Sequence, residues 1–392
     1  MIAVPIGEGE SYGAASAGVV FGGVSPEHDV SILTGLEAAR ELAKSRSDVA
    51  VIYWTKTGEW YRVDPGLEAI AFSEGVPRGA EPLRFVAGPG GGFVSEGRLG
   101  RSKPLRVDVV VNCCHGGPGE DGSLQAAFDL AGVRYTGPST ASAAIGMDKL
   151  AFAGLSEASG LPVLPRRMLE PAPAGASGDG AGGTEPGKVD FPGPYIVKPR
   201  FGGSSIGIEV VADLATARAR LSANPHLRRG AVIEPHRSDL HDLNVAVRTW
   251  PELRLSAIER PVRDGGEFLA YRDKYVGGEG MATARRELPA RLERKIEDRL
   301  REVAREVAVL CQVRGAARVD FLSGGSELYL NEINTIPGSL SRHLWVDPPV
   351  PFGTLLDGLI GEAMERPAAR YDATGADGTV LRSAGAIAAK LG

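Results

Sequence analysis

The amino-acid sequence predicts an α/β protein with two or three domains. Short apolar runs rich in β-branched residues alternate with segments of helical periodicity, as in proteins whose strands and helices pack together. The chain has 392 residues, and domains usually contain roughly 100–200 residues. Hydrophobic residues make up 43% and charged residues 24% of the sequence. This composition is close to the globular average and excludes fibrous and wholly disordered classes.

The N-terminal third is expected to form one α/β unit. It opens with an apolar run at 17–23 that ends in glycines, and a polar loop and a helical pattern through Leu42 follow. Two further apolar runs, Val49–Trp54 and Val107–Cys114, are bounded by polar residues, Gly or Pro. Such runs are typical of buried strands in a parallel sheet, so the pattern predicts strand, loop and helix followed by more parallel strands.

The later elements are separated by a tract without periodicity. Pro171–Gly187 is rich in Ala, Gly, Pro, Asp and Ser, and we expect a flexible insertion there. A strand begins at Tyr195 and enters a Gly/Ser loop, and Leu292–Cys311 carries apolar residues at helical spacing. The runs Ala317–Leu322 and Leu328–Ile333, joined by Ser-Gly-Gly-Ser, predict a β-hairpin.

Charge and cysteine content exclude several function classes. The net charge is −5 with no basic tail, which favours a small-molecule partner over nucleic acid or an anionic membrane. No apolar run approaches the about 18 residues of a spanning helix. The first Lys or Arg is Arg40, so the basic start of a secretory signal is missing. We therefore expect a cytoplasmic location. Cys113, Cys114 and Cys311 offer no C-x-x-C spacing for zinc or redox chemistry.

A Gly/Ser loop after the strand at Tyr195 is a candidate phosphate site. It runs from Lys198 to Gly207, and its backbone N–H groups could surround phosphate oxygens. It is not a Walker A loop, because the lysine precedes the glycines. The alternative interpretation is an ordinary surface turn.

The predicted hairpin carries a candidate metal site. Residues two apart on a strand share a face, so Arg318 projects with Asp320, and Glu332 projects with Asn334. Carboxylate and amide oxygens suit a Mg²⁺ ion that bridges nucleotide phosphates. Side chains alternate between the two faces of each strand. The Arg318–Asp320 set and the Glu332–Asn334 set therefore lie on the same face only if the numbers of two residues paired across the hairpin sum to an even value. The alternative is a solvated polar face with Arg318 in a salt bridge.

Two further loops follow predicted strands, where ligands bind in open α/β sheets. The first begins at His115 and includes Glu120 and Asp121, which could instead cap the next helix. The second begins at Gly22 and includes Glu27. Glu27 could hold a substrate ammonium group, or it could face a helix dipole.

Eight motifs in order give the chain a resemblance to the D-alanine–D-alanine ligases of the ATP-grasp superfamily. They span roughly residues 17–345. The motifs are Gly22-Gly-x-Ser-x-Glu-His-Asp-Val-Ser, His115-Gly-x-x-Gly-Glu-Asp-Gly-x-Leu-Gln, Tyr135-Thr-Gly-Pro-Ser, Met147-Asp-Lys, Val197-Lys-Pro with Gly203-Ser-Ser-Ile-Gly, Lys274-Tyr, Arg318-Val-Asp-Phe, and Asn331-Glu-Ile-Asn-Thr-x-Pro-Gly.

The resemblance implies a three-domain ATP-grasp fold with ATP held between the last two domains. The expected N-terminal α/β domain covers 1–137, the central domain 138–233, and the C-terminal domain with its extension 234–392. The implied reaction joins two D-amino acids through an acyl phosphate, giving D-Ala-D-Ala for peptidoglycan of the cell wall or a related dipeptide. One alternative is a dipeptide ligase of specialised metabolism with a non-alanine acceptor, and another is a non-catalytic nucleotide-binding relative.

The resemblance also implies roles for single residues toward ATP and metal. For ATP it implies Lys149 and Lys198 on the phosphates, the loop of Gly203, Ser204 and Ser205 over them, Glu234 and Asp242 on adenine and ribose, and Lys274 on the transferred phosphate. For metal it implies that Asp320, Glu332 and Asn334 ligate two Mg²⁺ ions, which Mn²⁺ could replace.

The resemblance implies small-molecule D-amino acids as substrates, and neither nucleic acid nor a membrane as a partner. It leaves open whether the protein forms a homodimer. The residues implied at the substrates are Glu27, His115, Lys274, Ser341 and His343. The residues implied in catalysis are Glu27, Ser204 and Tyr275, which together latch a mobile loop, and Arg318 with the N–H of Gly338, which stabilise the oxyanion.

The sequence departs from the family pattern where the acceptor is expected to bind. His343 stands where the family usually has a serine that binds the acceptor carboxylate, so we expect an altered acceptor preference. The alternative is that Ser339 or Ser341 takes the carboxylate. Pro235 follows Glu234 and cannot donate an N–H to adenine. The insertion and the extension from about residue 368 have no recognised counterpart.

Overall fold

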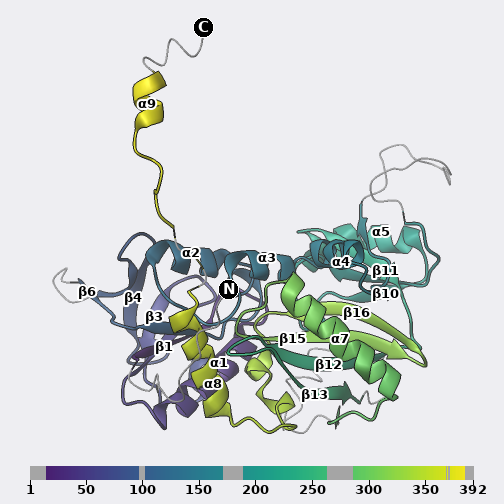
Figure 1. Cartoon of the computed structure of the whole chain (residues 1–392), viewed down its shortest axis with the longest axis horizontal. Helices are drawn as coiled ribbons and strands as arrows, with labels where there is room; N and C mark the ends of the chain where they lie inside the picture. The colour runs from purple at the N-terminus through teal and green to yellow at the C-terminus, as the bar shows by residue number, and fades with distance from the viewer. Residues whose placement is uncertain are drawn as a thin grey trace, which may run out of the picture.

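The computed structural model describes residues 15–96, 102–170, 189–262, 286–367, 369 and 371–384. The strands form three sheets, and Figure 1 shows the sheet of the N-terminal third on one side of the molecule and the two later sheets on the other. The α/β class is therefore confirmed. The predicted insertion Pro171–Gly187 and the predicted loop residues Lys274 and Tyr275 lie outside the described residues.

The N-terminal sheet combines parallel and antiparallel strands. Its order is β6-β5-β4-β3-β2-β1-β7, and β1 pairs in parallel with both β2 and β7. The predicted parallel strands are thus present, but β2 to β6 continue as an antiparallel meander. The strands are β1 (Ala17–Gly22), β2 (Val49–Trp54), β3 (Trp60–Val63), β4 (Glu81–Val86), β5 (Gly92–Glu96), β6 (Ser102–Pro104) and β7 (Val109–Asn112).

The central sheet is small and antiparallel, with order β10-β9-β11-β8. Its strands are β8 (Arg167–Leu169), β9 (Tyr195–Pro199), β10 (Glu209–Val211) and β11 (Ala231–Pro235). The strand predicted at Tyr195 is β9, which is buried along its whole length. The Gly/Ser loop leaves its carboxyl end, as the sequence predicted.

The C-terminal sheet carries the predicted hairpin. Its order is β14-β13-β12-β15-β16, and β15 pairs antiparallel with β16. The strands are β12 (His241–Arg248), β13 (Arg254–Pro261), β14 (Arg286–Glu287), β15 (Ala316–Gly324) and β16 (Glu327–Asn334).

Helices cover the sheets and close the cores. The helix predicted at Leu292–Cys311 is α7, and it buries Ile296, Leu300, Val303 and Val307 against the C-terminal sheet. The helices are α1 (His28–Ala43), α2 (Ser123–Ala131), α3 (Thr140–Met147), α4 (Lys149–Ala158), α5 (Leu214–Ala223), α7 (Arg294–Leu310), α8 (Phe352–Glu365) and α9 (Thr379–Ala384), and the short 3-10 segments are η2 (Ala69–Phe72), η4 (Gly117–Gly119), η5 (Pro225–Leu227) and η6 (Gly338–Leu344).

The segment η6 and helix α8 return to the N-terminal sheet. Leu340 of η6 and Leu359 of α8 lie in one buried cluster with Phe21 of β1 and Leu36 of α1. Figure 1 shows α8 beside α1. The segment between β16 and α8 is therefore held between the first and last parts of the chain, next to the loops that follow β1 and β7.

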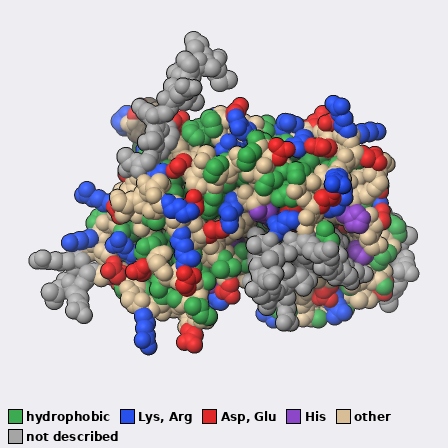
Figure 2. All heavy atoms as spheres, turned by 90° about the horizontal axis from the view of Figure 1, so that it is seen from below, with side chains coloured by type: hydrophobic (Ala, Val, Ile, Leu, Met, Phe, Trp, Pro, Cys, Tyr) green, Lys and Arg blue, Asp and Glu red, His purple; other side chains and the backbone are tan. Residues whose placement is uncertain are grey.

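The surface agrees with a small-molecule function. On the described part of the face in Figure 2, acidic and basic side chains are interspersed rather than gathered into a region of one sign. Among the residues that the structure describes, none belongs to a helix long and apolar enough to cross a bilayer.

The contact between α1 and β1 gives a stability prediction. A Cβ added at Gly35 would lie 2.3 Å from Cδ1 of Phe21, so Gly35→Ala should lower the free energy of unfolding by about 1–3 kcal/mol through overpacking. Gly154 on α4 has nothing within 4 Å of an added Cβ, and Gly154→Ala should stabilise by up to about 1 kcal/mol. Urea denaturation measures both. Equal midpoints for Gly35→Ala and the parent would contradict this packing.

Candidate active site

One cavity of about 240 Å³ is lined by the two later sheets and by the loops that follow β1 and β7 of the N-terminal sheet. The sequence-predicted residues that line it are Glu27, His115, Lys149, Lys198, Gly203, Ser204, Ser205, Glu234, Asp242, Arg318, Asp320, Glu332, Asn334, Gly338 and His343. Lys274 and Tyr275 lie outside the described residues. Ser341 is wholly buried and is not part of the lining.

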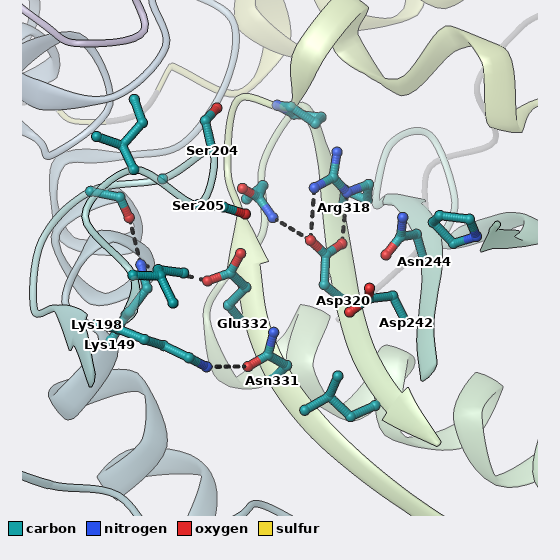
Figure 3. Close-up of a pocket in the computed structure, with 18 of the residues that line it drawn as sticks. Lys149, Lys198, Ser204, Ser205, Asp242, Asn244, Arg318, Asp320, Asn331 and Glu332 are labelled. Carbon is teal, nitrogen blue, oxygen red and sulfur yellow. Dashed lines mark hydrogen bonds and ion pairs between the residues drawn. The ribbon is translucent and has the colours of Figure 1, made fainter. Parts of the chain in front are cut away.

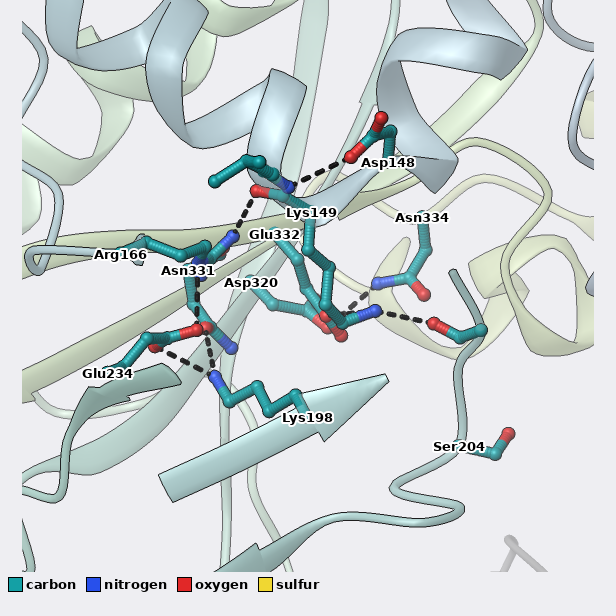
Figure 4. Close-up of polar contacts among 12 residues, drawn as sticks. Asp148, Lys149, Arg166, Lys198, Ser204, Glu234, Asp320, Asn331, Glu332 and Asn334 are labelled. Atoms are coloured by element: carbon teal, nitrogen blue, oxygen red, sulfur yellow. Dashed lines mark hydrogen bonds and ion pairs between the residues drawn. The ribbon is translucent and has the colours of Figure 1, made fainter. Parts of the chain in front are cut away.

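A buried ion cluster fixes Lys198 at the end of β9. The Nζ atom of Lys198 lies 3.0 Å from Oε2 of Glu234 and 3.2 Å from Oδ1 of Asn331. The other Glu234 oxygen lies 2.7 Å from Nε of Arg166 (Figure 4). Burial lowers the pKa of Lys198, and the Glu234 carboxylate opposes that shift. Burial acts to raise the pKa of Glu234, but Arg166 and Lys198 outweigh it and hold that pKa below its usual value.

The cluster changes the interpretation of Glu234. The family resemblance implies a contact of Glu234 with adenine or ribose, yet its side chain is 1% exposed and both of its oxygens meet cations. Its carboxylate is thus used to hold Lys198 in place. Arg166 and Asn331 were not identified from the sequence. Asn331 could have been suspected because it precedes Glu332 in a polar run, whereas Arg166 carries no sequence signal.

Lys149 begins α4 and reaches across to the hairpin. Asp148 caps this helix by accepting from the backbone N–H groups of Leu150 and Ala151. The Nζ atom of Lys149 donates to the carbonyl oxygen of Gly202 and lies 3.5 Å from Oε2 of Glu332. Lys149 therefore connects the glycine-rich loop with the predicted metal site.

The hairpin presents its polar residues on one face, as predicted. Arg318 pairs with Asn334 and Asp320 pairs with Glu332, and the register then shifts by one residue before Phe321. The Nε and Nη2 atoms of Arg318 lie 2.6 and 2.7 Å from the two oxygens of Asp320, and Nδ2 of Asn334 lies 2.9 Å from Oδ2 (Figure 3). The shift is a β-bulge, which leaves an extra residue on β16.

This donor set fits a divalent cation. Within the described ranges, no three His, Cys, Asp or Glu side chains gather as a metal cluster, but Asp320, Glu332 and the Asn334 amide supply hard oxygen donors on one face. Both carboxylates already face positive groups, Arg318 and Lys149. A cation could take over that neutralising role when bound.

Glu27 joins the N-terminal loop to the glycine-rich loop. One of its oxygens accepts a hydrogen bond from the Ser204 hydroxyl. A Cβ added at Gly116 would lie 2.3 Å from Oε2 of Glu27, and one added at Gly203 would lie 2.9 Å from it. The Glu27 carboxylate therefore fits between the loop after β7 and the glycine-rich loop because each has a glycine where it comes closest to the carboxylate.

The loop after β7 contacts the turn after β16. Glu120 accepts hydrogen bonds from the N–H groups of Gly116 and Ile336, both at 2.8 Å. The alternative that Glu120 caps the next helix is thus wrong, whereas Asp121 does accept from the N–H of Ser123 at the start of α2. Burial, with the nearby Glu27 charge, raises the pKa of Glu120 to about 8.

His115 is held from two sides. Its Nδ1 atom lies 2.7 Å from the carbonyl oxygen of Ile336, and its Nε2 atom lies 2.7 Å from Oγ1 of Thr34. A carbonyl oxygen only accepts, so Nδ1 carries the proton. Burial lowers the pKa of His115 to about 4, against the opposing effect of the Ile336 bond. The imidazole is thus neutral near pH 7.

His343 lines the end of the cavity beside a carboxylate that the sequence analysis missed. Its Nε2 atom lies 3.6 Å from Oε2 of Glu259, which also accepts from Asn244 and Arg286 at 3.2 and 3.1 Å. Burial acts to raise the pKa of Glu259, but His343 and these two donors lower it to about 2. The cavity thus combines both signs of charge at this end.

Comparison with known proteins identifies similar chains over nearly the whole length. The family models described as D-ala D-ala ligase N-terminus and C-terminus match residues 16–138 and 155–360. A "D-alanine--D-alanine ligase" of Nocardia farcinica is 33% identical over 363 residues, covering 89% of this chain and 96% of the relative. One of Bradyrhizobium is 31% identical, covering 89% of this chain and 95% of the relative.

Solved structures show the same fold. The D-alanine-D-alanine ligase from Coxiella burnetii superposes with a TM-score of 0.70 at 24% identity, covering 90% of this chain and 94% of that one. The VanG D-Ala:D-Ser ligase from Enterococcus faecalis gives a TM-score of 0.67 at 25% identity, covering 89% of this chain and 99% of that one.

The buried ion cluster predicts a large effect of charge removal. Glu234→Gln would leave the buried cations of Lys198 and Arg166 without their carboxylate, so the free energy of unfolding should fall by about 3–5 kcal/mol. The control is Glu252→Gln, which alters an exposed ion-pair partner of Arg254. Its free energy of unfolding should differ from that of the parent by no more than about 0.5 kcal/mol. Denaturant titration measures both. Equal stabilities of the two variants would contradict the role of the cluster.

Proposed function

Because the chain belongs to the D-alanine–D-alanine ligase family, we propose that it is an ATP-dependent ligase joining two D-amino acids through an acyl phosphate. The observation that carries this proposal is the single cavity in which Lys149 and Lys198 lie beside the Asp320–Glu332 pair. Cations for phosphate and carboxylates for a metal thus meet where a nucleotide and two small acids could bind together.

The first step is phosphoryl transfer to the donor. A carboxylate oxygen of the donor attacks the γ-phosphorus, a C(O)O–P bond forms, and the bond to the β-phosphate oxygen breaks to release ADP. Both reactants are anions, so Lys149 and Lys198 would lower their repulsion and align them. When bound by Asp320, Glu332 and Asn334, a divalent cation supplies further positive charge to the phosphate oxygens.

The second step forms the peptide bond. The neutral acceptor amine attacks the acyl carbon, and the carbonyl electron pair moves to oxygen. The pair then returns, the C–O bond to phosphate breaks, and the amine proton passes to phosphate or solvent. Arg318 and the Gly338 N–H would stabilise the oxyanion, and Glu27 would hold the donor ammonium group. Closure over this site protects the acyl phosphate from water.

We also propose the finer assignments made from the sequence. The site holds two Mg²⁺ ions. The three sheets correspond to three domains near the predicted boundaries. Lys274 and Tyr275 belong to the loop that closes over the site. The acceptor is D-Ala or a related D-amino acid. A non-catalytic relative is disfavoured because Lys149, Lys198, Asp320, Glu332 and Asn334 are all present around the cavity.

One experiment separates these functions. The purified chain is incubated with ATP, Mg²⁺ and pairs of D- and L-amino acids, and phosphate release and dipeptide mass are measured. Amino-acid-dependent phosphate release with a D,D-dipeptide product supports the ligase. Nucleotide binding without any amino-acid-dependent turnover would favour the non-catalytic relative.

The metal proposal predicts how turnover changes when the carboxylate of Glu332 becomes an amide. Glu332→Gln removes a charge from a side chain that is 27% exposed, so the fold should persist while turnover falls by about 100-fold or more. Glu302→Gln changes an exposed carboxylate of α7 that lies outside the cavity lining, and should retain parent turnover. Phosphate release is the measurement, and near-parent turnover in Glu332→Gln would refute the metal site.

The acceptor proposal predicts a change in selectivity. His343→Ser should alter the ranking of acceptors more than that of donors, because the replaced imidazole lines the cavity beside Glu259. His241→Ser, at an exposed histidine of β12, is the control. The same acceptor ranking in His343→Ser and the parent would show that His343 does not select the acceptor.

A further inference from the structure

Three hydrogen bonds from the N-terminal third of the chain surround the backbone of Gly338. Glu120 accepts from the N–H of Ile336 at 2.8 Å, and His115 donates to the carbonyl oxygen of Ile336 at 2.7 Å. On the other side of Gly338, the Ser339 N–H donates to Oγ1 of Thr34 at 3.0 Å. The backbone of Ile336, two residues before Gly338, and the peptide group between Gly338 and Ser339 are thus held by residues more than 200 positions earlier in the chain.

Thr34 connects the two sides of this arrangement. Its hydroxyl oxygen accepts from Ser339, which leaves its hydrogen free to donate to Nε2 of His115, 2.7 Å away. Because Nδ1 of His115 donates to Ile336, Nε2 has the lone pair that this bond requires. Thr34 is 1% exposed and His115 is 3% exposed, so water does not substitute easily for either bond.

The segment that Thr34 holds does not adopt its conformation readily. Ser339, Leu340 and Ser341 have φ values of 47°, 49° and 54°, three successive residues in the left-handed region. Residues other than glycine rarely occupy that region, and runs of them persist only when the surroundings hold them. The Thr34 bond holds the first of the three, and Leu340 packs into the cluster that contains Leu36 of the same helix.

We propose that Thr34 is a positioning residue for the peptide-forming step, because its hydroxyl group fixes the turn that carries the Gly338 N–H. This inference rests on the proposed function, in which that N–H stabilises the oxyanion. The oxyanion develops only when the amine attacks the acyl phosphate. Loss of the Thr34 hydroxyl should therefore slow peptide formation and spare phosphoryl transfer, which depends on Lys149 and Lys198.

The test separates the two steps in one reaction mixture. Thr34→Val keeps the branched shape and removes both hydrogen bonds. Reversible phosphoryl transfer is followed by positional isotope exchange in ATP labelled with ¹⁸O at the β,γ-bridge, and dipeptide is followed by mass spectrometry. Dipeptide formation should fall roughly 10- to 100-fold, while the exchange rate and the KM for ATP stay within about twofold.

Control variants distinguish positioning from general destabilisation. Thr34→Ser retains the hydroxyl group and should restore most of the dipeptide rate. Thr55 is 5% exposed, and its hydroxyl group donates to the Glu59 carboxylate in the turn between β2 and β3, outside the cavity lining, so Thr55→Val should leave both rates near the parent. If Thr34→Val does not fold, as judged by its melting curve, Thr34→Ala undergoes the same comparison.

Two outcomes would overturn the inference. Exchange and dipeptide formation could fall together in the Thr34 variants, which would indicate a structural role only, or Thr34→Val could retain the parent dipeptide rate. A parent protein that shows neither exchange nor dipeptide would instead contradict the proposed function. The two failures are therefore distinguishable.

Discussion

The active site depends on the attachment of the turn after β16 to the N-terminal loops. Both backbone polar groups of Ile336 are bound by the loop after β7, through Glu120 and His115. Leu340 joins a core that β1, α1 and α8 share with other strands of the N-terminal sheet. Since a buried backbone group without a partner is costly, this segment adopts its shape only when the first and last parts of the chain are in contact. The cavity is thus a product of the tertiary fold rather than of any one sheet.

Charge pairing explains how so many ionised groups share one cavity. Lys198 is balanced by Glu234, Asp320 by Arg318, and Lys149 faces Glu332. An unpaired buried charge would cost several kcal/mol, so these pairs keep the site folded before substrates arrive. Phosphate groups and a divalent cation bring the same two signs of charge. Binding can then exchange one set of partners for another without a large change in the net charge of the cavity.

The sequence predicts what local pattern determines, and misses what distant partners determine. The hairpin and α7 follow from periodicity, and the even register holds between Arg318 and Asn334 and between Asp320 and Glu332. The bulge beyond Asp320 was not predicted, although the buried apolar positions of β16 change phase there, from Leu328 and Leu330 to Ile333. Arg166, Glu259 and Thr34 were missed because each acts on a residue far along the chain. Glu27 and Ser204 were associated only through the family resemblance, although they lie in contact.

The left-handed turn also decides which side chains of this segment reach the cavity. A right-handed helical turn and a left-handed one present successive side chains in opposite rotational order, so sequence alone does not tell which residue faces inward. Here Ser341 is wholly buried, its Oγ has no hydrogen-bond partner among the described residues, and His343 lines the cavity. Nε2 of His343 lies 3.6 Å from the carboxylate of Glu259 on β13. Whether Ser341 or His343 lines the cavity therefore follows from the left-handed backbone of three residues, which Thr34 and Leu340 hold in place.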